Sequence, residues 1–162
     1  MPSVFWLVVV GVLVVVLVVK RFRGGPLTAR DAFVSPVVLL GIGAYELTKV
    51  PEFSGLDIGW LVLGTVVGLV FGGLRGTTTL LSERDGGLWQ RYTKWTVAVW
   101  LIASASSFGL GVLGVALGAH EEARPIVLSV GISLIGEAAV VGFRAKALGV
   151  RFAPEPARRR WV

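Results

Sequence analysis

The sequence predicts an all-α membrane protein, a bundle of five transmembrane helices with a short cytoplasmic β-hairpin between the third and the fourth. Hydrophobic residues make up 54% of the 162 residues and charged residues only 16%, which leaves more apolar surface than a soluble domain of this length could bury. The apolar residues fall into five runs, each close to the roughly 20 residues that a helix needs to cross a bilayer. We therefore expect one transmembrane domain over residues 1–143 and a basic, mobile tail over 144–162.

The first predicted span covers residues 3–19, a run of aliphatic and aromatic residues followed at once by basic residues. A secretory signal has its positive charge before the apolar run, so the reversed order favours a retained helix with its N-terminus outside. The second predicted span, 34–50, contains Pro36, two glycines and Glu46 and is the least lipid-like of the five. Its polar face should point into the bundle.

The third predicted span, 58–74, begins a series of glycines at every fourth position that continues into the next loop. The series consists of Gly64, Gly68, Gly72 and Gly76. This spacing places the four on one helix stripe, where another helix can approach closely. Glycine is also common in membrane helices, an alternative that explains one such pair better than three overlapping pairs. We expect close packing along the stripe, and a leucine at Gly68 should disrupt the fold more than a leucine at the isolated Gly11.

The long polar stretch over residues 72–95 lies between apolar runs and must sit outside the membrane. Two β-prone runs flank Asp85-Gly86-Gly87, whose residues tolerate positive φ. We predict a hairpin over residues 77–93 with its turn at Asp85-Gly86; the alternative is an irregular or helical amphipathic linker.

The fourth predicted span, 95–119, is rich in serine and glycine, and the fifth, 126–143, contains Glu137 in an otherwise apolar run. With the N-terminus outside, 14 of the 16 lysines and arginines fall on the inner side of a five-span chain. The positive-inside rule predicts this asymmetry and places the C-terminus in the cytoplasm.

Three stretches of the chain resemble the CcdC family of small bacterial multi-span membrane proteins: GGPLTARDAF, VSPVVLLGIGAYEL and GLRGTTTLLSERDGGLWQRYTKWTVAVW. The resemblance covers about residues 20–118, and its more specific parts are the RG before the predicted hairpin and the DG-x-LW-x-R that follows. It implies a multi-pass protein of the bacterial inner membrane with an accessory role near cytochrome c maturation and no defined biochemical activity. Because the chain has no cysteine, it could not itself pass electrons between thiols.

Two carboxylates lie inside predicted spans, Glu46 and Glu137, and the cost of burying a charge in hydrocarbon makes them site candidates. Helical rise places both near mid-depth, where they could share a proton or a polar pocket with Tyr45 and Ser133. The alternative is a helix clasp, with Glu46 paired to Lys49 and Glu137 protonated or bonded to a serine of the fourth span. Glutamine at Glu137 would then fold at least as well, whereas it would abolish turnover if Glu137 donates a proton.

Three functions are consistent with these features, and whether the chain is an enzyme stays open. The leading one is a non-enzymatic accessory or scaffold protein of the bacterial inner membrane. The alternative is a membrane-embedded enzyme acting on an isoprenoid or lipid, with Glu46 or Glu137 as general acid. Its apolar pocket would be lined by Tyr45, Trp60, Trp100, Phe108 and Ser133. The second alternative is a small transporter or transporter subunit, which no internal repeat favours.

Basic residues around the predicted hairpin could bind lipid phosphate or only orient the chain. They are Arg75, Arg84, Arg91 and Lys94. We expect no metal and no cofactor, since the chain has one histidine, His120, and no cysteine. The formal charge of +6 does not indicate nucleic acid, because the basic residues cluster beside apolar runs. The expected partners are the bilayer, an isoprenoid or lipid ligand, and a second copy of the chain or another membrane protein.

Overall fold

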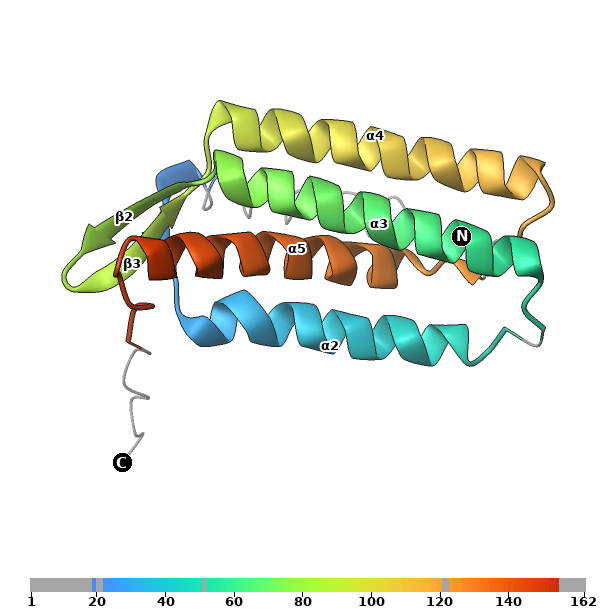
Figure 1. Ribbon diagram of the computed structural model, residues 1–162, viewed down its shortest axis with the longest axis horizontal. Helices are drawn as coiled ribbons and strands as arrows, with labels where there is room; N and C mark the ends of the chain where they lie inside the picture. Colours follow the sequence, from blue (N-terminus) through green and yellow to red (C-terminus); the bar gives the residue numbers. More distant parts are fainter. Residues whose placement is uncertain (1–18, 20–21, 51, 121–122, 155–162) are drawn as a thin grey trace, which may run out of the picture.

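The computed structural model describes residues 19, 22–50, 52–120 and 123–154, which form four long helices with a small sheet at one end (Figure 1). The helices are α2 (Ala29–Leu47), α3 (Gly55–Thr78), α4 (Lys94–Ala116) and α5 (Ile126–Ala147). Among the described residues, α3, α4 and α5 are long and apolar enough to cross a membrane, which is consistent with a membrane protein. α2 contains Arg30, Asp31 and Glu46 within its 19 residues and does not meet the same criterion. The first predicted span lies almost wholly outside the described residues.

Short polar residues fix the starts of three of these helices. Thr28 accepts a hydrogen bond from the Asp31 backbone N–H at the start of α2. Ser54 begins α3 and Thr93 begins α4, each in a reciprocal capping box with the residue three positions later. These side chains satisfy backbone N–H groups that have no partner within the helix.

α5 is the central helix, because it packs against α2 and against α3, whereas α4 packs on α3 (Figure 1). The glycine stripe of α3 explains the close approach to α5. A Cβ at Gly72 would overlap the carbonyl group of Ser133, and a Cβ at Gly136 of α5 would lie 2.7 Å from the Leu69 carbonyl oxygen. The predicted close packing is confirmed, but its tightest point is Gly72, since a Cβ at Gly68 would lie 3.2 Å from the Ile132 side chain and 3.8 Å from the Ser129 carbonyl oxygen.

The predicted hairpin is confirmed, with strands β2 (Leu80–Arg84) and β3 (Gly87–Arg91) paired antiparallel. Asp85 and Gly86 form the turn, with φ of 52° and 73°, in the region that suits aspartate and glycine. The predicted start at residue 77 is wrong, because α3 continues to Thr78.

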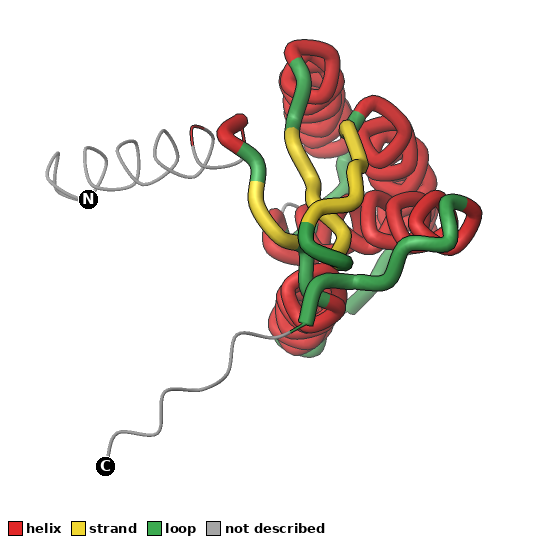
Figure 2. Tube along the Cα trace, turned by 90° about the vertical axis from the view of Figure 1, so that its left-hand side faces the viewer, coloured by secondary structure: helices red, strands yellow, loops and turns green. Residues whose placement is uncertain are grey.

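A third strand completes the sheet at its other edge. β1 (Gly25–Pro26) pairs antiparallel with β3, so the strand order is β1-β3-β2. The sheet lies across one end of the helices (Figure 2). Leu88 of β3 is fully buried and belongs to the same cluster as Val141 and Ala145 of α5, which attaches the sheet to the central helix.

The prediction of a mobile tail from residue 144 is wrong for its first part. α5 continues to Ala147, and the chain after it runs along the sheet, where the Ala153 N–H donates to the Leu27 carbonyl oxygen at 2.9 Å. Val150 and Phe152 pack against the buried cluster beneath the sheet. Residues 155–162 lie outside the described residues.

Candidate functional site

A half-open cavity of about 700 Å³ lies between α3, α4 and α5. Its wall on α3 extends from Asp57 to Arg75, about 27 Å at the rise of an α-helix and close to the thickness of a hydrocarbon core. The lining is mostly apolar and includes four large aromatic side chains, Trp60, Phe71, Trp100 and Phe108. Such a lining suits the hydrocarbon part of a ligand.

α4 contacts α3 near both of its ends, and the cavity lies between these two contacts. At the sheet end, the Thr96 hydroxyl donates to the Thr78 carbonyl oxygen at 3.0 Å. At the other end, a Cβ at Gly114 would lie 3.5 Å from the Trp60 ring. The residues facing the gap between these contacts are largely small, namely Gly64, Gly68, Ala103, Ser107 and Gly111. Side chains of this size leave the space between the helices unfilled.

Four of the five residues predicted to line an apolar pocket do line this cavity: Trp60, Trp100, Phe108 and Ser133. The fifth, Tyr45, does not. Its side chain lies on α2 with 64% of its surface exposed, and the Lys49 ammonium group lies 4.8 Å from its ring centroid. Of the five residues predicted to line a pocket, those on α3, α4 and α5 therefore lie at the cavity and the one on α2 does not.

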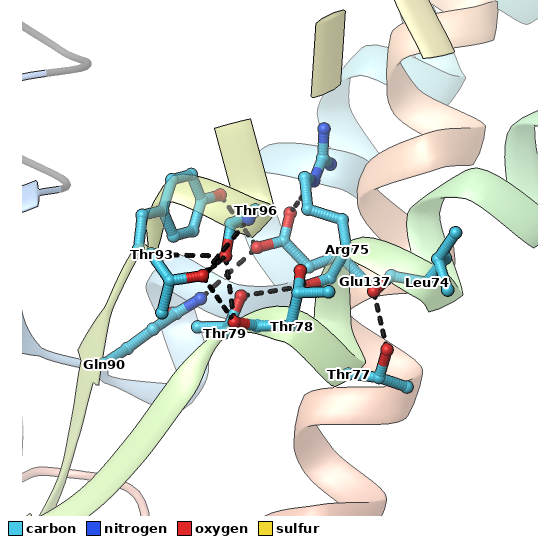
Figure 3. A network of polar contacts seen from close by, with 10 residues as sticks. Leu74, Arg75, Thr77, Thr78, Thr79, Gln90, Thr93, Thr96 and Glu137 are labelled. Atoms are coloured by element: carbon cyan, nitrogen blue, oxygen red, sulfur yellow. Dashed lines mark hydrogen bonds and ion pairs between the residues drawn. The ribbon is translucent and has the colours of Figure 1, made fainter. Parts of the chain in front are cut away.

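Glu137 is the centre of a buried polar cluster beneath the sheet (Figure 3). Arg75 donates from Nε to Glu137 Oε2 at 2.7 Å, and both side chains are 7% exposed. Tyr92 donates its hydroxyl to Oε1 at 2.7 Å, and Gln90 donates Nε2 to the same oxygen at 3.2 Å. Glu137 therefore joins α5 to α3 and to the end of the hairpin, and its partners are not serines of α4.

Glu46 and Glu137 do not form the shared pocket that the sequence suggested. α2 and α5 run antiparallel, with Gly43 against Leu128 and Gly131 against Leu39. This register places Glu46 near the end of the bundle that lies away from the sheet, about 18 Å along the axis from Glu137. Among the described residues Glu46 also has no ion pair, so its predicted pairing with Lys49 is wrong.

The four basic residues proposed as phosphate ligands have different environments. Arg75 is buried in the ion pair with Glu137. Arg84 lies over the Trp89 ring, with its guanidinium carbon 5.1 Å from the ring centroid. Arg91 and Lys94 are exposed. Arg84, Arg91 and Lys94 are therefore exposed at the sheet end, whereas Arg75 is not.

At the opposite end, Asp57 joins α3 to the residues that follow α4. Its side chain is fully buried, caps α3, and accepts hydrogen bonds from the His120 backbone N–H at 2.7 Å and from the His120 ring at 2.8 Å. No group of three metal-ligating side chains occurs within the described part of the chain.

Arg124, just before α5, turns its side chain into the cavity between α3 and α4. A Cβ at Gly64 would lie 3.1 Å from its Nε, and a Cβ at Gly111 would lie 3.7 Å from its Nη1. Nη1 is buried and has no hydrogen-bond partner among the described residues. Burial lowers the pKa of the Arg124 guanidinium. Sequence reasoning missed this residue, because an arginine in an outer turn is ordinarily a solvated charge.

No protein-family model, curated protein or solved structure matches this chain, so the resemblance to the CcdC family stays a hypothesis.

Proposed function

We propose that the chain is a non-enzymatic accessory protein of the bacterial inner membrane that binds a lipid-like amphiphile between α3, α4 and α5. The cavity is the observation that supports this function. Its volume of about 700 Å³ falls in the range of small-molecule sites, and its aromatic and aliphatic lining matches an acyl or isoprenoid chain. The tightly packed α2–α5–α3 core would hold two walls of the site rigid while α4 forms the third.

The ion pair at Glu137 favours binding over catalysis by this residue. A general acid must present a proton to its substrate, whereas both carboxylate oxygens of Glu137 are engaged by Arg75, Tyr92 and Gln90. Arg75 lines the cavity, and Glu137 lies behind it. Glu137 is therefore better placed as a clasp between helices than as an acid.

The cavity can be tested with two matched substitutions on α4. Ala103 lines the cavity, whereas Ala105 lies on the opposite, exposed side of the same helix. In detergent, a brominated stearyl alcohol should quench the tryptophan fluorescence of the wild type and of Ala105→Phe saturably, because Trp60 and Trp100 line the site. Ala103→Phe should weaken this quenching by about tenfold or more, since its ring would occupy the ligand volume. Equal quenching of all three proteins would refute binding in this cavity.

We further propose that the sheet end faces the cytoplasm, because exposed basic residues gather there. They include Arg23, Arg30, Arg84, Arg91 and Lys146. The chain has no cysteine, so a single introduced cysteine is the only thiol that a maleimide can label, and its reaction shows on which side of the membrane it lies. Glu52→Cys, at the far end, should react with an impermeant maleimide on intact cells. Glu83→Cys, in β2, should react only after lysis, and the reverse pattern would overturn this orientation.

A further inference from the structure

We infer that the ligand is a single-chain anionic amphiphile and that Arg124 binds its head group within the cavity, an assignment that rests on the proposed function. The carboxylate of a fatty-acid-like lipid and the phosphate of a prenyl-like lipid share this chemistry. Both would accept charge-assisted hydrogen bonds from a guanidinium group.

The position of Arg124 is the first observation in favour of this assignment. Its guanidinium reaches Gly64, about 13 Å along α3 from the end at Gly55. Arginines near the ends of membrane helices usually extend toward the polar interface. Here the side chain extends inward, between two glycines that leave room for it.

The second observation is that Arg124 has no ion-pair partner among the residues that the structure describes. No carboxylate lies within salt-bridge distance of it in the described part of the chain, and its Nη1 is buried without a partner. Burying part of a guanidinium group without a counter-ion is costly, and an anionic head group would offset that cost. Arg75 also lines the cavity, and its Nη2 is likewise buried without a hydrogen-bond partner among the described residues, but its charge is paired with Glu137. The difference between the two arginines places the anion at Arg124.

The remaining length of the cavity suits one hydrocarbon chain. From Gly64 to Arg75 the wall on α3 extends about 16 Å, and Phe71 and Leu134 line this half. A head group at Arg124 would direct the chain along this half toward the sheet end. A lipid with two hydrocarbon chains would have to extend one of them out of the cavity through its open side.

The test compares oleate with oleyl alcohol, which has the same chain without the charge, at a pH where the carboxylate is ionised. The full-length wild type in detergent should bind oleate about tenfold or more tightly than the alcohol. Arg124→Gln should abolish this preference and leave the affinity for the alcohol unchanged. Arg124→Lys should keep part of it, and Lys49→Gln, which removes an exposed cation of the same end, should keep all of it.

Stability gives a second, independent readout. Because Arg124 has no ion pair within the described part of the chain, Arg124→Gln without ligand should melt at the same temperature as the wild type or higher. A marked loss of stability would show that the protein itself compensates the charge and would overturn the inference.

The remaining outcomes separate this inference from the proposed function. If both amphiphiles bind equally and Ala103→Phe blocks both, the cavity binds lipid but Arg124 does not select its charge. If neither binds, both proposals fail. Displacement of oleate by inorganic phosphate would show a site for free anions and contradict an amphiphile site, whereas oleyl phosphate should compete with oleate.

Discussion

Replacing Glu137 by glutamine is expected to lower the free energy of unfolding by about 3–5 kcal/mol, because it leaves the Arg75 guanidinium buried without a counter-charge. Both side chains of the pair are only 7% exposed, so solvent compensates little for the lost partner. This result is opposite to what the sequence alone suggests, where glutamine keeps the hydrogen bonds of an isolated carboxyl group. Unfolding by a denaturing detergent, followed by loss of helical circular dichroism, measures the change.

Two further variants test whether loss of the ion pair causes the expected loss of stability in Glu137→Gln. Glu46→Gln, on α2 and without an ion pair among the described residues, should change the unfolding free energy little. The double variant Arg75→Met, Glu137→Leu should recover much of the stability lost by Glu137→Gln, since it removes both charges together. A wild-type unfolding curve for Glu137→Gln would show that the pair does not stabilise the fold.

Gly72→Ala is expected to cost about 3 kcal/mol or more of unfolding free energy, because the added methyl group would overlap the Ser133 backbone and force α3 away from α5. Gly59 is the matched control on the same helix, since a Cβ there would meet nothing within 4 Å. Gly59→Ala should be neutral or stabilise the helix by up to about 1 kcal/mol. Equal melting temperatures of the two variants would contradict the close approach of the helices.

Features that depend on local sequence could be predicted. The turn at Asp85-Gly86 follows from residues that tolerate positive φ, and the packing stripe follows from glycines spaced by about one helical turn. The sequence also named four residues that now lie at the cavity, Trp60, Trp100, Phe108 and Ser133, because they stand on apolar runs. The sequence could not show that α4 stands away from α5 and leaves the space open.

The partner of Glu137 could not be predicted from the sequence. Arg75 lies 62 residues away, at a position where the apolar run ends and a basic residue is expected to face lipid phosphate. Ala153 was assigned to a mobile tail for a similar reason. The partner of its N–H is the carbonyl oxygen of Leu27, which is also far away in the sequence. The sequence shows that a charged residue lies in an apolar run, but only the fold shows which residue carries the opposite charge beside it.

The central claim, that the cavity between α3, α4 and α5 holds an amphiphile, is tested most directly by native mass spectrometry of the full-length chain extracted gently from its membrane. The wild type and Ala105→Phe should both retain an adduct with the mass of a lipid-like amphiphile, and Ala103→Phe should have lost it. If the wild type carries no adduct after extraction and acquires none when amphiphile is added, or if Ala103→Phe retains it in full, the cavity is not the binding site.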